Sequence, residues 1–285
     1  MANSLSPLRY PGGKSVLTAF LRTVLEINNL HDCCYVEPFC GGAGAAIGLL
    51  LGEHVKNIHL NDIDKSVYSF WWSILNETNR FITRIENIPV TLDEWKKQKH
   101  IFLNNNADIF DRGFATFFLN RCNHSGILLA NPIGGIKQTG KWKIDVRFNK
   151  KTLISRIDNI SKYKSNIKLS NLDVFELIKK IKDHDKQFIY LDPPYIQGGP
   201  TLYLNSFTIK THFLLSSVLR EIQSKWIMTY DNADILYTAY RYCKIKKFSL
   251  NYSAHKKRAG IELLICPQHV SLPVLPPHST PTIIS

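Results

Sequence analysis

The sequence predicts an α/β fold of the doubly wound type, in which helices cover both faces of a mostly parallel sheet. Three observations support this prediction. Short apolar segments alternate with longer segments that have helical spacing. A glycine-rich turn follows the first predicted strand and leads into a helix. Acidic residues stand at the ends of later strands, and this succession is typical of the opening of a nucleotide-binding βαβ unit.

The first part of the chain alternates helices and strands. Residues 14–28 place apolar side chains at helical spacing, and residues 33–39 form a short apolar run typical of a buried strand. Glycine and small apolar residues at 41–52 predict a turn that opens a helix. Residues 55–64 predict a second strand that ends in acids, and residues 65–75 predict the helix after it.

An insertion interrupts this alternation. The chain there contains helical stretches near 93–103 and 108–121, followed by a glycine-rich, basic segment at 123–151. We therefore predict a discontinuous core with a smaller, mainly helical domain inserted into it. The predicted ranges are 1–77 and 161–266 for the core and 78–160 for the insertion.

The alternation resumes in the second part of the chain. Helices are predicted at 173–182, 210–223 and 233–240, strands at 187–192 and 225–230, and further β-rich stretches at 242–252 and 260–267. The last residues, 267–285, are rich in proline and poor in charge. We expect this tail to be disordered.

The composition indicates a basic globular protein. Lys plus Arg total 36 against 23 Asp plus Glu in 285 residues, which gives a net charge of +13. Such an excess favours a polyanionic partner such as DNA or RNA. A basic protein without any nucleic-acid function also fits this composition.

Several classes of protein are disfavoured. No apolar run is long enough for a membrane span, and the N-terminal residues lack the pattern of a secretory signal. The six cysteines form no C-x-x-C pair, and the histidines show no metal-ligand spacing. We therefore expect a cytoplasmic protein with reduced cysteines, no membrane contact and no metal site.

Two glycine-rich segments are candidates for ligand binding. The first, "YPGGKS" at 10–15, ends like a P-loop but lacks the earlier glycine, since Leu8 stands there. The second, "VEPFCGGAGA" at 36–45, follows a strand and opens a helix. Such a turn brings the backbone close to a ligand, and Asp62 or Asp64 after the next strand can bind ribose hydroxyls. NAD, S-adenosylmethionine and a purely structural turn all fit this geometry.

Glu37 distinguishes between the two cofactors. It lies between the strand and the glycines, where a dinucleotide pyrophosphate requires a positive field. A carboxylate there repels phosphate, but it suits the cationic sulfonium and the amino group of S-adenosylmethionine. The sequence therefore favours S-adenosylmethionine over NAD.

An unusual end to a strand supplies the candidate catalytic residues. The apolar run at 187–191 is followed by Asp192, Pro193, Pro194 and Tyr195. The Asp192 carboxylate and the Pro193 carbonyl can accept both hydrogens of a planar amine, and proline restricts the backbone beside that carbonyl. The amine lone pair then turns toward a methyl donor, and Tyr195 offers a ring on which a flipped base can stack. The alternative is a strand terminator without chemistry.

Four segments in the same order resemble the motifs of the Dam-type adenine-N6-specific DNA methyltransferases, the Asp-Pro-Pro-Tyr class with the alpha order of motifs. They are "RYPGGKS", "VEPFCGGAG", "NDID" and "LDPPY", and "FFLNRCNHSG" resembles the Asn-Arg segment that leads into DNA recognition. The similarity spans roughly residues 7–266. It implies a Rossmann-like S-adenosylmethionine-dependent methyltransferase core with an inserted, mainly helical target-recognition domain. The sequence departs from the family pattern in three places. The second glycine of the loop falls on Ala43, and Thr211 replaces the acid that usually precedes the histidine, here His212. The family's arginine shortly after the Asn-Gly segment has no clear match in "SGILLANP", which leaves the target sequence open.

The resemblance also assigns residues to the site. Asp173 falls at the family's acid that accepts a hydrogen bond from the cofactor adenine. The residues expected to bind S-adenosylmethionine are Tyr10, Lys14, Glu37, Pro38, Phe39, Gly41, Asp62, Asp173 and Asp192. The expected catalytic residues are Asp192, Pro193, Pro194 and Tyr195.

Basic residues interleaved with aromatic ones occupy the segment 136–151. This pattern fits a loop or hairpin that reaches into DNA, with some residues on phosphates and a few on bases. A second basic loop, "SAHKKRAG" at 253–260, is a candidate phosphate clamp. A solvated basic hairpin without function is the alternative. The expected DNA contacts are Arg121, Asn123, Lys137, Lys141, Trp142, Arg147, Lys256, Lys257 and Arg258.

These observations predict methyl transfer from S-adenosylmethionine to the N6 amine of a flipped adenine in a short target sequence of double-stranded DNA, with S-adenosylhomocysteine as the product. Cytosine N4, an RNA base or a glutamine amide is the alternative acceptor, and a catalytically silent DNA-binding relative is the alternative class. A cognate restriction endonuclease, a monomer or weak dimer, and a bacterial, phage or mobile-element origin complete the expectation.

Overall fold

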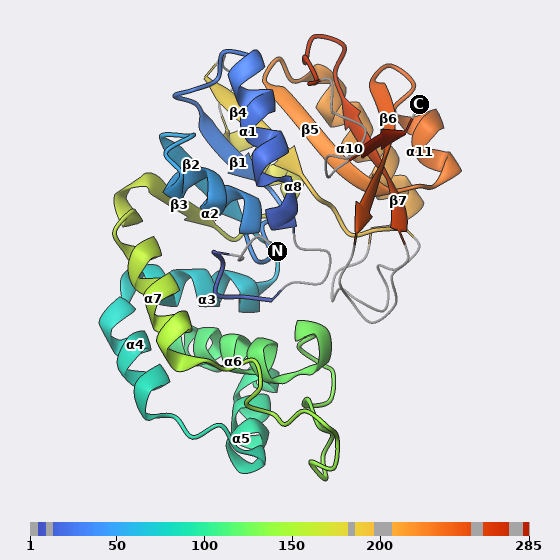
Figure 1. Ribbon diagram of the computed structural model, residues 1–285. Helices are drawn as coiled ribbons and strands as arrows, with labels where there is room; N and C mark the ends of the chain where they lie inside the picture. The colour runs from blue at the N-terminus through green and yellow to red at the C-terminus, as the bar shows by residue number, and fades with distance from the viewer. Residues whose placement is uncertain are drawn as a thin grey trace.

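The computed structural model describes residues 5–9, 14–181, 186–196, 207–251, 259–273 and 282–284. Within these residues one sheet holds eight strands in the order β3-β2-β1-β4-β5-β7-β6-β8 (Figure 1). Neighbours from β3 to β5 run parallel, whereas β7 lies antiparallel to both β5 and β6. The strands are β1 Cys34–Glu37, β2 Asn57–Asn61, β3 Ile167–Ser170, β4 Gln187–Leu191, β5 Lys225–Asp231, β6 Lys244–Asn251, β7 Ala259–Cys266 and β8 Thr282–Ile284.

Helices cover both faces of this sheet, so the α/β prediction is confirmed. Phe188 and Tyr190 of β4 belong to the hydrophobic cluster that contains α1 and α2, while Ile189 and Leu191 belong to the cluster with α8, α10 and α11. Alternate residues of a strand point to opposite faces, and β4 is buried on both. The helices of the core are η1 Lys14–Leu17, α1 Thr18–Ile27, α2 Gly44–Leu51, α3 Lys65–Asn76, α8 Val174–Lys180, α10 Ile209–Glu221 and α11 Asp234–Ala239.

The strand order reverses between β1 and β4. The chain runs from β1 outward to β2 and β3 and then returns to place β4 on the other side of β1. In open α/β sheets the connections at such a point diverge and leave a crevice at the carboxyl ends of the strands. Since Val36 is in register with Ile189, Glu37 and Asp192 emerge at the same edge.

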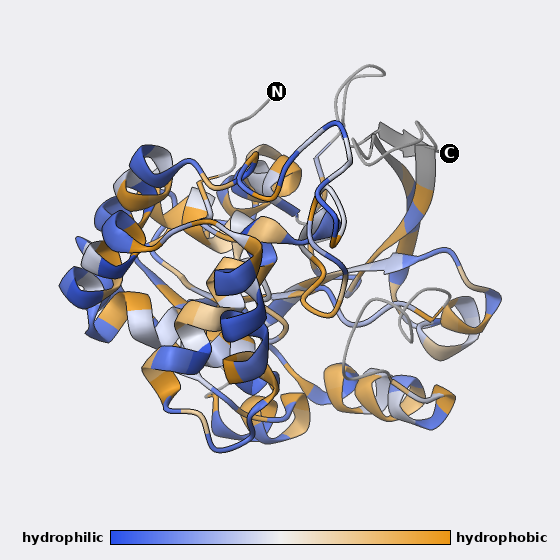
Figure 2. Cartoon of the chain, turned by 90° about the horizontal axis from the view of Figure 1, so that it is seen from below, coloured by the Kyte–Doolittle hydropathy of each residue, from blue (hydrophilic) through white to orange (hydrophobic). Residues whose placement is uncertain are grey.

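The segment between β2 and β3 is helical in its described structure. Its helices lie below the sheet in Figure 1, and all but one of them pack on α3. They are α4 Thr78–Asn87, α5 Leu92–Leu103, α6 Ile109–Cys122 and α7 Lys150–Ser161, with the short turns η2 His124–Gly126 and η3 Lys164–Asn166. Seen from below, their ribbons mix hydrophilic and hydrophobic stretches, as expected for helices with one buried face (Figure 2). None of the described helices is long and apolar enough to cross a membrane.

The helical segment has no hydrophobic core of its own. Phe81 of α4 and Phe117 of α6 contact Phe70 of α3, at centroid distances of 6.0 Å each. Trp71 beside it is fully buried, as expected for a core residue. The same cluster continues to the sheet through α1 and α2. The helical segment and the core therefore share one hydrophobic cluster, and recognition of a DNA target by the segment stays a prediction.

The C-terminal tail differs from its expectation where it is described. Val270 is fully buried, and the Ser271 amide donates to Asn28 Oδ1 over 2.9 Å. Residues 282–284 pair with β6, with Ile284 opposite Lys247. The disorder predicted for 267–285 is thus wrong for 267–273 and 282–284. Val270 belongs to the hydrophobic cluster that contains α1, and residues 282–284 pair with β6, which a count of prolines and charges does not reveal.

Candidate active site

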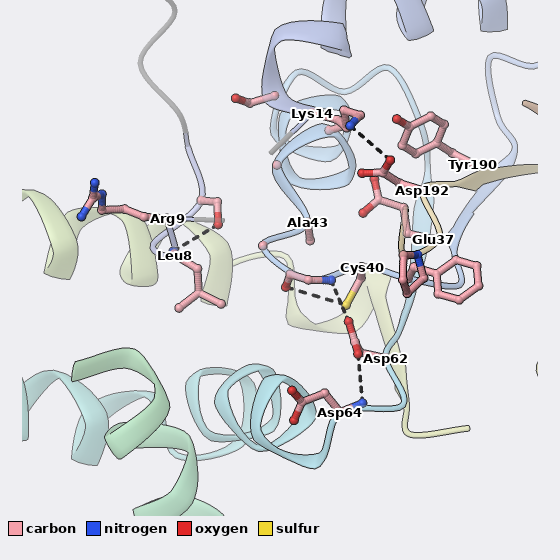
Figure 3. Close-up of a pocket in the computed structure, with 18 of the residues that line it drawn as sticks. Leu8, Arg9, Lys14, Glu37, Cys40, Ala43, Asp62, Asp64, Tyr190 and Asp192 are labelled. Carbon is pink, nitrogen blue, oxygen red and sulfur yellow. Dashed lines mark hydrogen bonds and ion pairs between the residues drawn. The ribbon is translucent and has the colours of Figure 1, made fainter. Parts of the chain in front are cut away.

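A cavity of about 280 Å³ lies at the carboxyl edge of the sheet (Figure 3). That volume is close to the lower end of the range of small-molecule sites, roughly 300–1,000 Å³. Most of the residues expected to bind the cofactor line this cavity. They are Lys14, Glu37, Phe39, Gly41, Asp62 and Asp192.

The glycine turn forms one wall of the cavity. Gly41 and Ala43 both have a left-handed backbone, with φ of 43° and 45°. Glycine adopts that region without strain, and alanine does so only at a cost of about 1 kcal/mol. A Cβ on Gly44 would lie 3.1 Å from the Ser15 Cβ, so glycine lets the segment of Lys14 pack closely on α2. Ala43 therefore takes over the conformation of the glycine that the family pattern has there.

Two acids, buried Glu37 and half-buried Asp62, face the cavity at the ends of β1 and β2. Glu37 Oε1 accepts hydrogen bonds from the Ala46 amide at 3.0 Å and from the Tyr35 hydroxyl at 3.1 Å. Asp62 accepts from the amides of Gly41 and Asp64 at 2.8 and 3.0 Å, so it holds the glycine turn beside β2. Burial raises the pKa of Glu37 to about 8 and the pKa of Asp62 to about 7. A cationic ligand would favour the ionised form of both groups.

Asp192 enters the cavity directly after β4. Its Oδ1 lies 3.1 Å from Lys14 Nζ and accepts from the Thr229 hydroxyl at 3.0 Å. Thr229 in turn is 2.7 Å from the Tyr190 hydroxyl, which fixes its position. Burial raises the pKa of Asp192, while Lys14 and Thr229 oppose that rise. The carboxylate is therefore held in one orientation by neighbours on both sides.

Tyr195 does not line the cavity, although its hydroxyl contacts a residue that does. Its hydroxyl accepts from Lys14 Nζ at 2.6 Å and donates to Glu262 Oε1 at 2.8 Å. Its ring stacks on Tyr230 at 5.9 Å, and the Tyr230 hydroxyl donates to the Pro194 carbonyl at 3.2 Å. These contacts fix the Asp-Pro-Pro-Tyr turn, and the role of Tyr195 as a stacking platform stays a prediction.

Glu262 of β7 is a site residue that the sequence analysis did not single out. It is buried, lies 3.6 Å from Lys14 Nζ, and accepts from Tyr195. Burial raises its pKa to about 7. The available signal was an acid inside the apolar run "GIELLIC", since a buried carboxylate requires a partner.

Two of the described residues that were expected to bind the cofactor do not line the cavity. Asp173 caps α8 by accepting from the Phe175 amide at 2.8 Å. The Pro38 carbonyl accepts from Asn61 Nδ2 at 2.9 Å, so Pro38 supports the turn from behind. Tyr10 lies outside the described residues.

Two of the expected DNA contacts are buried. Asn123 is fully buried, donates to the carbonyls of Ile127 and Leu128, and accepts from the Trp95 indole at 2.7 Å. It has no free surface for a base, so its prediction as a DNA contact is wrong. Arg121 is also buried and donates to the Arg147 carbonyl at 2.8 Å, although it lines the cavity.

The remaining basic residues of the insertion are exposed. Trp142 is 60% exposed, and it lies in a segment of turns without a β-hairpin. Exposure leaves these side chains accessible to DNA without showing a contact. The exposed members are Lys137, Lys141, Trp142 and Arg147, while Lys256, Lys257 and Arg258 lie outside the described residues.

The site thus combines a glycine turn, buried acids suited to a cation, and an oriented carboxylate that can accept from an amine. Residues 10–255 match the model of the D12 class N6 adenine-specific DNA methyltransferases. Because the match covers most of the chain, the protein belongs to this family. It is an adenine-specific DNA methyltransferase that acts on the N6 amine, as its sequence predicts.

A curated relative agrees with this assignment. The chain is 23% identical over 244 residues to the Type II methyltransferase M.CviBI of Paramecium bursaria Chlorella virus NC1A, covering 81% of this chain and 87% of the relative. Two solved structures resemble it weakly. A conserved hypothetical protein of Streptococcus pyogenes has 10% identity, coverage of 87% and 96%, and a TM-score of 0.36. The rRNA methyltransferase aviRa of Streptomyces viridochromogenes has 12% identity, coverage of 93% and 90%, and a TM-score of 0.35. Similarity at this level supports no conclusion about function.

Proposed function

We propose that the cavity binds S-adenosylmethionine and that Asp192 and Pro193 hold the target amine beside it. The observation that carries this proposal is the placement of Glu37 and Asp192 at the adjacent ends of β1 and β4, in one cavity. The glycine turn lets backbone approach a ligand, and the buried acids favour a cation. These residues therefore fit S-adenosylmethionine, which supplies an electrophilic methyl group and leaves as S-adenosylhomocysteine.

Asp192 has two tasks toward the adenine amine. Its carboxylate accepts one N–H, the Pro193 carbonyl accepts the other, and the nitrogen lone pair is thereby turned toward the methyl donor. Thr229 keeps the carboxylate in this orientation. As the amine acquires positive charge, the nearby carboxylate stabilises that charge. The proton then leaves the methylated nitrogen for solvent, because an N-methylated adeninium is acidic.

Lys14 occupies a donor position beside Asp192 in this structure. Its ammonium contacts Asp192 Oδ1 and lies 5.1 Å from the centre of the Tyr195 ring. A target amine requires the same acceptor, so Lys14 has to turn toward Glu262, which already lies 3.6 Å away. Glu262 is thus a positioning residue that gives the ammonium an alternative partner.

The DNA contacts, the partners and the location extend the proposal. Exposed Lys137, Lys141, Trp142 and Arg147 would meet the duplex, and the loop with Lys256, Lys257 and Arg258 would bind phosphates. Asp173 and Tyr10 would contribute to the cofactor site. A cytoplasmic location, a monomer or weak dimer, and a restriction endonuclease as partner also belong to this proposal.

Cofactor binding tests the first part of the proposal directly. Calorimetric titration with S-adenosylhomocysteine should show one site per chain, and Glu37→Gln should weaken it at least about tenfold, since a unit charge contact is lost. Exposed Glu176, in the matched variant Glu176→Gln, should leave the affinity unchanged. Equal affinity in Glu37→Gln and wild type would remove Glu37 from the cofactor site.

A further inference from the structure

Three arginines meet at the end of the cavity away from Asp192. Arg9, Arg121 and Arg156 all line the cavity, and they come from the N-terminal segment, α6 and α7. In Figure 3 Arg9 points away from Glu37 and Asp192, on the other side of the loop that carries Ala43.

These guanidinium groups have no acidic partner in the part of the chain that the structure describes. Among the described residues no carboxylate forms an ion pair with any of the three, and Arg9 Nη1 is buried without a hydrogen-bond partner. Arg121 is 91% buried, because its relative exposure is 9%. Burial, followed by the charges of Arg9 and Arg156, lowers the pKa of Arg121 to about 9. Like charges packed this closely disfavour the folded state unless an anion joins them.

The hydrogen bonds within the cluster join side chains to backbone groups, so they leave the positive charges of the arginines uncompensated. Arg121 donates to the Pro7 carbonyl at 3.4 Å, and Arg156 donates to the Ser6 carbonyl at 3.1 Å. The Arg9 backbone is fixed to the Asn120 side chain in both directions, at 2.7 Å each. Hydrogen bonds therefore hold the guanidinium groups of Arg121 and Arg156, and the backbone of Arg9, in place before any ligand arrives.

The positive charge continues from the cavity to the surface. Arg121 Nε donates to the carbonyl of exposed Arg147, and the charge of Arg147 acts on both Arg9 and Arg121. A single carboxylate, such as that of the cofactor, would compensate only one of these positive charges. A nucleic acid duplex instead offers one negative charge per about 1.7 Å of its axis, which matches a row of cations better.

We propose that Arg9, Arg121 and Arg156 form a preorganised binding site for a phosphodiester of the DNA substrate, continuous with Arg147 on the surface. This inference rests on the proposed function of the cavity. It adds a DNA contact to that function, because the site would bind the DNA backbone at the end of the cavity opposite the catalytic carboxylate. Segment 6–9 leads toward Lys14, so the same contact connects the backbone of the DNA to the cofactor segment.

Salt-dependent binding tests the proposal. Fluorescence anisotropy would measure the affinity for a labelled duplex between about 50 and 200 mM salt, with S-adenosylhomocysteine present. Arg9→Gln and Arg156→Gln should each reduce the slope of log affinity against log salt by about 0.9, the value for one lost phosphate contact. Arg156→Lys should keep most of the slope. Arg22→Gln, which alters an exposed arginine paired with Glu26 on α1, is the control and should match wild type.

The outcomes separate this inference from the proposed function. Unchanged slopes in both variants, or weaker S-adenosylhomocysteine binding with unchanged DNA affinity, would overturn the phosphate site. So would a failure of both glutamine variants to fold, because the cluster would then be structural. If wild-type protein itself neither binds S-adenosylhomocysteine nor methylates DNA, it is the proposed function that fails.

Discussion

At the scale of single residues, the site depends on carboxylates whose environments differ. Asp192 is contacted by Lys14 and Thr229, whereas Glu37 accepts hydrogen bonds from an amide and a hydroxyl and forms no ion pair with any described residue. The first arrangement orients a charged acceptor. The second leaves Glu37 able to ionise when a cationic ligand binds, because burial raises the pKa of Glu37 to about 8.

Removal of the Asp192 carboxylate should abolish methyl transfer. We expect Asp192→Ala to lower the rate by at least about a hundredfold, because an aligned acceptor and a charge-stabilising group are both lost. S-adenosylhomocysteine binding should persist in part, since the glycine turn and Glu37 remain. Transfer of tritiated methyl and calorimetry measure the two quantities. Asp158→Ala, at an exposed ion pair on α7, is the control, and full activity of Asp192→Ala would refute the assigned role.

Glu262→Gln should separate catalysis from binding. Without the carboxylate, Lys14 stays on Asp192, so kcat should fall about tenfold while KM for the cofactor changes less than about twofold. The activity of the wild type should rise with pH near 7, because burial raises the pKa of Glu262 to about 7. The variant should lack this rise. Steady-state kinetics from pH 6 to 9 would show this loss. An unchanged pH profile with lower thermal stability would indicate a purely structural role.

At the scale of elements, α6 connects the insertion to the site. Asn120 fixes the Arg9 backbone, Arg121 lines the cavity, and Asn123 ends the helix in a buried network. The "FFLNRCNHSG" segment is thus a structural joint as well as a candidate for DNA contact. Polar residues in such a joint satisfy backbone groups that a turn leaves without partners.

Replacement of Asn123 should affect stability and not DNA contact. Asn123→Ala leaves the Trp95 indole and two carbonyls without a partner, and we expect a loss of about 1–3 kcal/mol in the free energy of unfolding. The salt slope of DNA binding should stay as in wild type. Urea denaturation measures the first quantity, with exposed Asn131→Ala as the control. Normal stability combined with a reduced slope would reinstate Asn123 as a DNA contact.

The sequence predicts the elements that carry strong local patterns. The glycine turn, the fully buried strand β4 and the amphipathic α1 follow from periodicity. Strand β3 is not predicted from the sequence, because it is only half buried and has polar Lys168 and Ser170 on either side of Leu169. Asp192 and Lys14 form an ion pair although they lie 178 positions apart in the sequence (192 − 14). Local patterns cannot predict such a contact, so only the family motifs indicate that both residues belong to the site. The arginine cluster has no local signature, because three separate elements supply it.

At the scale of the whole molecule, the cavity is divided by charge. Glu37, Asp62 and Asp192 occupy the end near the sheet, whereas the arginines occupy the end near the insertion. If the proposed site is correct, a cationic cofactor and a polyanionic substrate would meet opposite potentials within it. The overall charge of +13 adds a field that attracts DNA to the protein.

This charge division should make stability depend on pH. Burial raises the pKa of Glu37 from its ordinary value of 4.5 to about 8. The folded state then binds the extra proton, so Glu37 stabilises the protein fully below pH 4.5 and loses that contribution as pH rises through 8. Glu37→Gln should flatten the fall in unfolding free energy over this window, by up to about 1.4 kcal/mol per pH unit. Urea titrations of both proteins at pH 5, 6.5 and 8 measure the difference, and parallel curves would contradict the assignment.

One assay tests the central claim most directly. Protein and tritiated S-adenosylmethionine are incubated separately with duplex DNA, single-stranded DNA, RNA and a protein mixture, and the labelled nucleosides are then separated. Label in duplex DNA, recovered as N6-methyladenine and absent with Asp192→Ala, is the predicted result. Label that appears only in RNA, or as N4-methylcytosine, would contradict the account.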